Sequence, residues 1–221
     1  QVMSAGNLRE KLFAQYQDFE RTDGSSVISP EGFERLCNDL GFDMAKIEPL
    51  VLMWKVGCTE LGTVSYASWQ DSLAAMNVSS TSQLRKATDE AVEQMATDAQ
   101  MYKTFYRRMF DYLKPGKQKT ISAEAKGGHI WGFAKGVLPV IKRADNKVFD
   151  KFVKFLDAHG DKVKTINRDQ WQSLLELSQT MDESLSEYSK DDAWPALFDD
   201  FADWVQKQPA EAEGGSDMVV Q

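Results

Sequence analysis

The amino-acid sequence predicts an all-α protein built from pairs of helix–loop–helix units. Apolar residues recur at spacings of three and four along most segments, which is the periodicity of an amphipathic helix. A short frame is also repeated, in which an apolar residue precedes a capping Ser or Asn and an aromatic residue follows four positions after the cap. The 221 residues are enough to bury an ample core, either as one large domain or as two small ones.

Composition and charge disfavour several classes of function. The chain has 34 acidic and 26 basic residues, and its formal net charge of -8 disfavours non-specific binding to a nucleic-acid backbone. A basic protein partner is favoured instead. The two cysteines, Cys37 and Cys58, cannot form a disulfide framework and fit a reducing compartment. No apolar run approaches membrane-spanning length and no signal-peptide pattern opens the chain, whose start at Gln1 indicates a fragment or a processed product.

The first two helices are predicted from apolar stripes and from capping residues. Large apolar side chains recur at helical spacing between residues 8 and 19, and a turn-rich stretch follows. Ser29 has the character of an N-cap, with Pro30 at the first helical position and Gly41 at the end of the helix. The expected buried stripe of this second helix consists of Phe33, Leu36, Cys37 and Leu40.

A third helix is expected to run from a cap at Asp43 through Trp54, and it contains a proline. Pro49 lies too far inside this segment to be free of cost, because a proline within a straight helix costs about 3 kcal/mol. We therefore expect a kink at Pro49 or a delayed start of the helix.

The middle of the chain predicts two further helices and a boundary. Residues 79–100 are polar with spaced apolar positions, and residues 102–113 are strongly apolar at helical spacing. The stretch from Lys114 to Lys119 contains Pro and Gly and breaks the second of these helices. We expect it to separate an N-terminal half, residues 7–113, from a C-terminal half, residues 118–208.

The C-terminal half is expected to end in a helix with two contrasting faces. Pro195 suits the first turn of a helix, because its missing N–H would have no partner there. Six large apolar residues share one face: Trp194, Leu197, Phe198, Phe201, Trp204 and Val205. Asp199, Asp200 and Asp203 fall on the opposite face, which is either a solvated acidic surface or a site for a cationic partner. Residues 209–221 have the composition of a disordered tail.

The repeated frame resembles the layout of paired EF-hands. It occurs at residues 28–33, 64–69 and 166–171, with a partial copy at 121–126, and each apolar residue before the cap is placed to act as a hydrophobic staple. In paired EF-hands, each unit has a helix, a loop with a short extended segment that pairs with its neighbour, and a second helix. We therefore expect EF-hand-like pairs.

Calcium binding is not expected in these loops. An EF-hand loop needs early oxygen ligands, a central glycine and a closing bidentate glutamate. The first loop places Ser26 at the glycine position and Gly32 at the closing position, and the last one closes on Arg168. None of the loops can assemble the ligand cage, so the sequence predicts helix–loop–helix pairs without calcium ligands.

No catalytic or cofactor-binding constellation is visible in the sequence. His129 and His159, with two scattered cysteines, cannot supply a tetrahedral zinc site. There is no Gly-rich phosphate loop and no Gly-x-Ser-x-Gly elbow. Carboxylates are plentiful, so a paired acid–base site remains open at this point, although nothing singles one out. We expect neither a metal nor a cofactor.

The closing segment carries a resemblance to a known family. The pattern Asp-x-Ala-Trp-Pro-x-Leu-x-Asp-Asp-Phe-x-x-Trp at residues 191–204 resembles the C-terminal signature of the defective-in-cullin-neddylation family. Residues 36–43, 50–55, 105–106 and 166–171 also match family positions and extend the resemblance over most of residues 7–207. The resemblance implies an all-helical potentiating-neddylation domain that acts as a non-catalytic co-ligase, promoting transfer of a ubiquitin-like modifier to cullins.

The family resemblance also implies a cullin-binding patch. Family members use an Asp, Ala, Asp patch to hold the C-terminal winged-helix subdomain of a cullin, and these positions fall on Asp169, Ala193 and Asp199. Asp169 also has a structural explanation, since a carboxylate in the first turn after a cap at Asn167 favours the helix dipole. Asp199 is expected one turn further into its helix, where that explanation is weaker.

A second implied site is an apolar pocket for the acetylated N-terminal methionine of the neddylation conjugating enzyme. Its aligned positions are Phe33, Ala45, Leu50, Leu52, Val64, Tyr112, Ile130 and Phe133, and these could equally be plain core. The chain departs from the family at Pro49, Gly62 and Val64. The resemblance further implies a monomer in the cytoplasm and nucleus. The alternative is an EF-hand-like interaction scaffold of another pathway, and a small helical enzyme also stays open.

Overall fold

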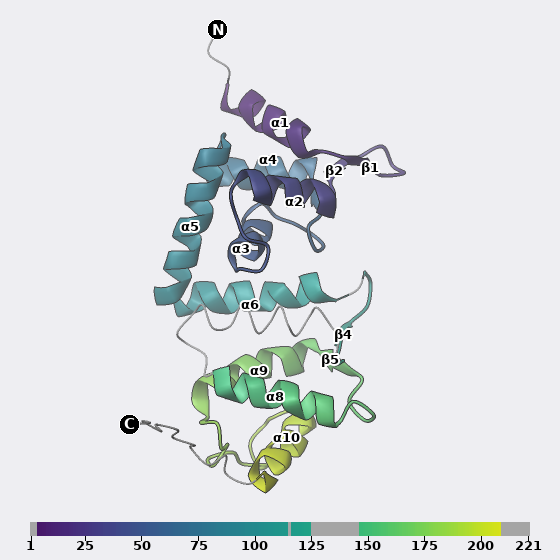
Figure 1. Ribbon diagram of the computed structural model, residues 1–221, viewed down its shortest axis with the longest axis vertical. Coiled ribbons are helices and arrows are strands. Elements are labelled where there is room, and N and C mark those ends of the chain that lie inside the picture. Colours follow the sequence, from purple (N-terminus) through teal and green to yellow (C-terminus); the bar gives the residue numbers. More distant parts are fainter. Residues whose placement is uncertain (1–3, 115, 125–145, 209–221) are drawn as a thin grey trace, which may run out of the picture.

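The protein folds as a series of helices joined by short strands, which confirms the all-α expectation (Figure 1). The computed structural model describes residues 4–114, 116–124 and 146–208. The helices are α1 (Ala5–Tyr16), α2 (Pro30–Asp39), α3 (Glu48–Lys55), α4 (Tyr66–Ala75), α5 (Thr81–Thr97), α6 (Ala99–Leu113), α8 (Asn146–Ala158), α9 (Arg168–Thr180) and α10 (Ala196–Lys207). The strands are β1 (Phe19–Glu20), β2 (Ser26–Ile28), β3 (Val64–Ser65), β4 (Thr120–Ser122) and β5 (Thr165–Asn167).

The helices are arranged along one long axis. Figure 1 shows α1 to α4 at one end, with α5 running from them toward the middle and α6 lying across the molecule. Helices α8, α9 and α10 occupy the other end, and β4 and β5 lie together at the edge where α6 ends. Within the described ranges, no helix has the length and apolar character needed to cross a membrane.

The copies of the repeated frame pair with one another in two antiparallel ladders. Ile28 of β2 lies opposite Val64 of β3, and Ile121 of β4 lies opposite Ile166 of β5. These four side chains are buried, as a hydrophobic staple requires. The copies therefore fold as matched pairs, while their kinship with EF-hands stays a prediction.

Helices α2, α3 and α4 end in the same way, with a residue in the left-handed backbone conformation just after the helix. Gly41, Gly57 and Asn77 have φ values of 70°, 76° and 55°, in the left-handed region. After each of them the next N–H donates back into the helix, as from Phe42 to the carbonyl of Cys37 at 2.9 Å. The predicted end of the second helix at Gly41 is thus confirmed.

Pro49 delays the start of α3. The helix begins at Glu48, which puts the proline in its first turn, where the missing N–H has no helical partner. The delayed start that the sequence predicted is confirmed, but the expected cap at Asp43 is wrong. Asp43 instead stabilises a separate turn, in which its carboxylate accepts the backbone N–H of Ala45 at 2.9 Å.

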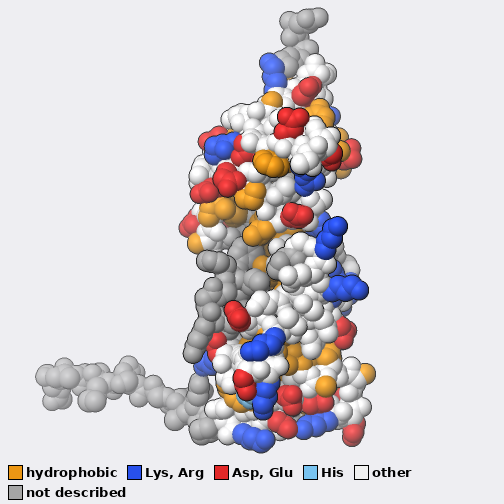
Figure 2. Space-filling model, turned by 90° about the vertical axis from the view of Figure 1, so that its right-hand side faces the viewer, with side chains coloured by type: hydrophobic (Ala, Val, Ile, Leu, Met, Phe, Trp, Pro, Cys, Tyr) orange, Lys and Arg blue, Asp and Glu red, His pale blue; other side chains and the backbone are white. Residues whose placement is uncertain are grey.

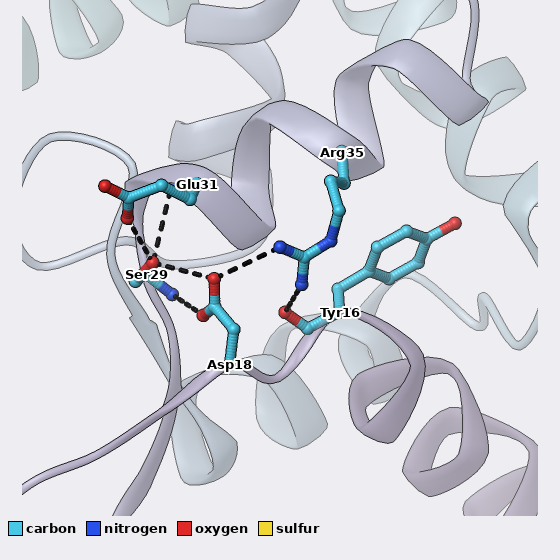
Figure 3. A network of polar contacts seen from close by, with 5 residues as sticks. All are labelled: Tyr16, Asp18, Ser29, Glu31 and Arg35. Atoms are coloured by element: carbon cyan, nitrogen blue, oxygen red, sulfur yellow. Dashed lines mark hydrogen bonds and ion pairs between the residues drawn. The ribbon is translucent and has the colours of Figure 1, made fainter.

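The start of α2 is tied to the end of α1 by a polar network (Figure 3). The carboxylate of Asp18 accepts the backbone N–H of Ser29 at 2.8 Å and contacts Arg35 at 3.4 Å, and Arg35 also donates to the carbonyl of Tyr16 at 3.1 Å. Burial raises the pKa of Asp18, but the hydrogen bonds from Ser29 and the charge of Arg35 outweigh it and hold that pKa below its usual value. Gly32 of α2 lies against the Tyr16 carbonyl and the Asp18 carboxylate, so its lack of a side chain lets α2 approach the end of α1 closely.

Replacing Gly32 by alanine should destabilise the protein by about 1–3 kcal/mol, the usual cost of overpacking a tight contact. An added Cβ would meet the Tyr16 carbonyl oxygen and would lie 2.9 Å from Oδ1 of Asp18. Urea unfolding followed by circular dichroism measures the effect. Gly160→Ala is the matched control, because the nearest atom to its added Cβ would be the Leu156 carbonyl oxygen at 3.6 Å, an ordinary contact. Equal stability of the two variants would show that α1 and α2 do not need this close approach.

Helices α6 and α9 are joined by a reciprocal aromatic pair. The rings of Tyr106 and Trp171 stack with centroids 4.6 Å apart and planes 12° apart. The Tyr106 hydroxyl donates to the Trp171 carbonyl at 3.0 Å, and Nε1 of Trp171 donates to the Tyr106 carbonyl at 3.0 Å. Because α6 precedes the predicted boundary and α9 follows it, this pair connects the two predicted halves. The division at residues 114–119 itself stays a prediction, although α6 does end at Leu113.

The closing helix buries the face that the sequence assigned to the core. Leu197, Phe198, Phe201 and Val205 are buried, while Trp194 and Trp204 pack against the core at its edge. The ring of Phe152 in α8 contacts Phe198 and Phe201 at centroid distances of 5.6 and 5.2 Å. The predicted tail, residues 209–221, lies outside the described residues.

Candidate functional site

The exposed side of α10 carries a row of carboxylates. Asp200 is exposed, Asp199 and Asp203 are half-buried, and Asp191 and Asp192 extend the row into the preceding turn. Because α10 buries its aromatic face, its own carboxylates, Asp199, Asp200 and Asp203, fall on the opposite face. We call these five aspartates the acidic face.

The start of α10 differs from the expectation by one residue. Pro195 has ψ of 138° and precedes the helix as its N-cap residue, so the helix begins at Ala196. Asp199 therefore lies in the first turn and not one turn further in. A favourable interaction with the helix dipole is thus available to Asp199 as well as to Asp169, which also lies in the first turn of its helix.

Tyr188 holds the carboxylate of Asp199. Its hydroxyl donates to Oδ1 at 2.7 Å, and its ring stacks on Trp194 with centroids 6.3 Å apart. Burial, followed by the hydrogen bond to Asp199, raises the pKa of Tyr188, so the phenol stays a neutral donor. Ala193 is exposed and directly precedes Trp194. Tyr188 and Trp194 therefore link two of the predicted cullin-binding positions.

A lysine beside the acidic face offsets part of its charge. Nζ of Lys190 lies 2.6 Å from Oδ1 of Asp203, and both side chains are about half exposed, at 55% and 42%. The hydrogen bond with Asp203 raises the pKa of Lys190, and the same contact lowers the pKa of Asp203. This ion pair lies on the surface, where a cationic group from a partner can compete for the carboxylate.

A tight turn before Tyr188 positions this part of the chain. Asp182 accepts the backbone N–H of Ser184 at 2.9 Å and the hydroxyl of Ser186 at 3.0 Å. Hydrogen bonds from these serines lower the pKa of Asp182 to about 2, so the turn keeps its ionised acceptor at neutral pH. Leu185 adopts a φ of 53° and buries its side chain in the core, which fixes the turn to the body of the protein.

Asp169 lies on a different helix from Asp199. It is exposed in the first turn of α9 and lines a cavity of about 540 Å³. The other lining residues are Phe110, Lys114, Lys117, Gln118, Lys119, Asn167 and Arg168. Asp169 therefore has mainly basic neighbours, whereas Asp199 lies among carboxylates. The grouping of these two with Ala193 as one binding patch stays a prediction.

The positions aligned with the methionine pocket fall into three groups. Five are buried in the core, each at most 4% exposed: Phe33, Leu50, Leu52, Val64 and Tyr112. Ala45 is exposed. Ile130 and Phe133 lie outside the described residues, so the assignment of all eight positions to a pocket stays a prediction.

Among the residues that the structure describes, two buried polar atoms at or beside these positions have no hydrogen-bond partner. They are the hydroxyl of Tyr112 and Oε2 of Glu48, the residue that precedes Pro49 at the start of α3. Sequence reasoning missed Glu48, because a single glutamate at a helix start gives no signal of burial. An unpartnered buried carboxylate oxygen is costly and is suited to pairing with a cation.

The cysteines and the described histidine are structural. Cys37 and Cys58 are free and fully buried, which confirms the prediction that Cys37 is a core residue. Burial raises the pKa of the Cys37 thiol to about 12, so the reactive thiolate is suppressed. His159 packs on Phe155 with ring centroids 4.5 Å apart, while His129 lies outside the described residues. Over the described ranges, no group of three or more His, Cys, Asp or Glu side chains is placed to hold a metal ion.

Comparison of the sequence with known proteins places the chain in a family. A family model described as "Cullin binding" matches residues 83–204, which is more than half of the chain. DCN1-like protein 4 of Drosophila melanogaster is 29% identical over 203 residues, covering 92% of this chain and 77% of that protein.

Two vertebrate relatives give the same result. DCN1-like protein 4 of Danio rerio is 31% identical and that of Homo sapiens is 30% identical, each over 188 residues and 85% of this chain. The chain spans 63% and 61% of the length of these two proteins. The matched range includes α9, residues 196–204 of α10 and the whole acidic face. The chain therefore belongs to the cullin-binding family, together with the DCN1-like proteins.

Proposed function

We propose that this protein is a non-catalytic co-ligase that promotes cullin neddylation. The observation that carries the proposal is the acidic face of α10, with Asp199 held by Tyr188, in a chain of the cullin-binding family. Its partner would be the C-terminal winged-helix subdomain of a cullin, bound through basic side chains. Complementary charges would set the orientation and the rate of association. The proposed location is the cytoplasm and nucleus.

The proposed mechanism is bridging. One surface binds the cullin while a second binds the conjugating enzyme that carries the modifier, so transfer between them becomes effectively intramolecular. The gain comes from proximity and orientation, which raise the effective concentration without new chemistry. No side chain of the co-ligase needs to touch the reacting atoms.

Bridging predicts faster modifier transfer only when both partners are present. In a single-turnover assay with a conjugating enzyme preloaded with modifier, we expect this protein to accelerate transfer to a cullin lysine. It should leave discharge to free lysine unchanged. Equal acceleration of both reactions would contradict bridging, and it would favour direct activation of the conjugating enzyme. A protein with no affinity for any cullin would favour the alternative, a scaffold of another pathway.

The second proposed partner is the conjugating enzyme's acetylated N-terminal methionine. A buried methionine side chain contributes about 1.5–3 kcal/mol. A free α-amino group, with a pKa of about 7.7–8.0, is largely protonated near neutral pH, and burying that charge unpaired costs several kcal/mol. None of the aligned pocket positions is acidic, so acetylation would remove a charge that they cannot compensate.

We expect a peptide that begins with acetyl-Met to bind on the order of tenfold tighter than its unacetylated twin. Isothermal titration calorimetry with the two peptides measures the difference. An acetyl-Gly version is the control for the side chain, and it avoids mutating Leu50, whose 1% exposure makes an acidic replacement a folding defect. Equal binding of the acetylated and free peptides would contradict the proposal. If the two peptides bind equally because the Glu48 carboxylate pairs with the free α-amino group, Glu48→Gln should weaken binding of the unacetylated peptide and leave binding of the acetylated one unchanged.

A further inference from the structure

The acidic face has a cation of its own. Lys190 directly precedes Asp191, and its Nζ lies 2.6 Å from Oδ1 of Asp203. Lys190 belongs to the loop before α10, whereas Asp203 lies in the third turn of the helix. In the part of the chain that the structure describes, no other carboxylate of the acidic face forms an ion pair. This contact therefore neutralises one of the five carboxylates.

The charge of Lys190 also acts on the rest of the acidic face. The hydrogen bond with Asp203 is the main cause of the raised pKa of Lys190, and the negative charges of Asp199 and Asp200 add to it. Tyr188, the hydrogen-bond donor to Asp199, is neutral and cannot offset the charge there. Figure 2 shows a similar mixing of charge more broadly, since Asp and Glu side chains lie among Lys and Arg side chains at the end of the molecule formed by α8, α9 and α10. A basic partner therefore meets an attraction that Lys190 reduces.

The ion pair between Lys190 and Asp203 is weak enough to be displaced. Both side chains are about half exposed, so water competes for the contact. A surface pair made by a flexible lysine contributes little, because holding the side chain in one geometry costs rotamer freedom. Among the described residues, the Lys190 ammonium group makes no other polar contact. It can therefore move into solvent without disturbing the core.

Displacement of Lys190 would open a pair of carboxylates to a partner. Asp199 and Asp203 are four residues apart on α10, so they lie one turn apart on the same side of the helix, with Cβ atoms about 5–6 Å apart. Of these two, Asp203 becomes available only when Lys190 leaves. A partner with two basic side chains at this spacing can use both carboxylates. A partner with one basic side chain gains less and leaves Lys190 in place.

We propose that Lys190 is an internal competitor, which a basic side chain of the partner displaces from Asp203 when the acidic face binds. The identity of that partner as a cullin rests on the proposed function. Lys190 would lower the affinity for every basic partner, and it would penalise most those that bring a single cation. It is therefore a specificity-determining residue of the acidic face.

The competition is tested first without any cullin. The full chain, labelled with ¹⁵N, is titrated by NMR with an acetylated and amidated tetra-arginine peptide at fixed ionic strength. We expect Lys190→Gln to bind the peptide about two- to fivefold tighter than the parent, the range of a surface ion pair. Lys46→Gln is the control and should leave the affinity unchanged, since it removes the same charge at an exposed lysine before α3. A peptide that does not bind, no gain in Lys190→Gln, or an equal gain in Lys46→Gln would overturn the competition.

Two further readouts separate displacement from a general effect of charge. The Nζ resonance of Lys190 should move toward those of exposed, unpaired lysines as the peptide is added, with the same midpoint as the backbone amides of residues 199–203. Lys190→Arg keeps the charge and can reach the same carboxylate, so it should bind the peptide no tighter than the parent. A Lys190 signal that stays in place at saturation, or tighter binding by Lys190→Arg, would overturn displacement.

A cullin C-terminal subdomain is then titrated against the same variants. We expect Lys190→Gln to bind it about two- to fivefold tighter, mainly through faster association, with Lys46→Gln unchanged. If the parent protein and Lys190→Gln bind the subdomain equally well, the cullin leaves Lys190 on Asp203 and the inference is overturned. If the parent does not bind the subdomain, the proposed function falls, and the peptide titration still decides whether Lys190 competes for Asp203.

Discussion

Replacing Asp199 by lysine should abolish binding to the cullin C-terminal subdomain while the protein stays folded. Removing one member of an interfacial charge pair costs about 2–5 kcal/mol, and the reversed charge adds repulsion from a basic partner. Asp199 is half-buried at the surface of α10, and its one described polar contact is the hydrogen bond from Tyr188. The longer lysine can extend into solvent, so the buried face of the helix is not disturbed.

Calorimetry and thermal unfolding of the same samples separate binding from folding. Asp71→Lys on α4 is the control, since it makes the same charge change at an exposed position away from the acidic face. Tyr188→Phe removes the hydrogen bond to Asp199 without altering charge, and it should cost only about 1 kcal/mol of affinity. Ala193→Arg should abolish binding by sterics and by repulsion. A folded Asp199→Lys variant with unchanged affinity would move the cullin site to another surface.

Replacing Trp171 by alanine should cost about 3–5 kcal/mol of folding free energy, a large part of the stability of a small domain. The side chain is 1% exposed, stacks on Tyr106, and donates its Nε1 proton to the Tyr106 carbonyl. Alanine leaves a cavity between α6 and α9 and removes the hydrogen bond from the indole to the Tyr106 carbonyl. Because Asp169 and Arg168 lie in the first turn of α9, the cavity that they line should lose its geometry as well.

Urea unfolding monitored by circular dichroism tests this loss. Trp171→Phe keeps an aromatic ring for stacking but removes the donor, so it should cost about 1–3 kcal/mol. Tyr106→Phe removes the reciprocal hydrogen bond from the hydroxyl to the Trp171 carbonyl. A Trp171→Ala variant as stable as the parent would mean that α6 and α9 are held together by other contacts.

Much of the fold could be predicted because its signals are local. The staple residues Ile28 and Ile166 lie next to their caps, and the structure pairs both of them with other copies of the frame. The stop at Gly41 and the late start of α3 at Pro49 follow from backbone preferences of single residues. The prediction of a helix cap at Asp43 was wrong, because the Asp43 carboxylate accepts the backbone N–H of Ala45 in a separate turn that precedes the helix.

The site could be predicted only in part, because its charges come from segments far apart in the chain. Asp199 was found from its own helix, but its donor Tyr188 lies in the loop before it. Asp169 was expected to join an acidic patch. In the structure it lines a cavity together with lysines from the end of α6 and the loop before β4, and its place in the patch stays a prediction.

The sequence by itself determined the helical class, the paired repeat, the buried face of α10 and the family. Each of these depends on residue type and on spacing within about a dozen residues, which the chain carries before it folds. The tertiary structure alone decided which residue holds the Asp199 carboxylate, which lysines line a cavity with Asp169 and which aromatic pair joins α6 to α9. Those are contacts between residues as far apart as Tyr106 and Trp171, and only packing brings such side chains together.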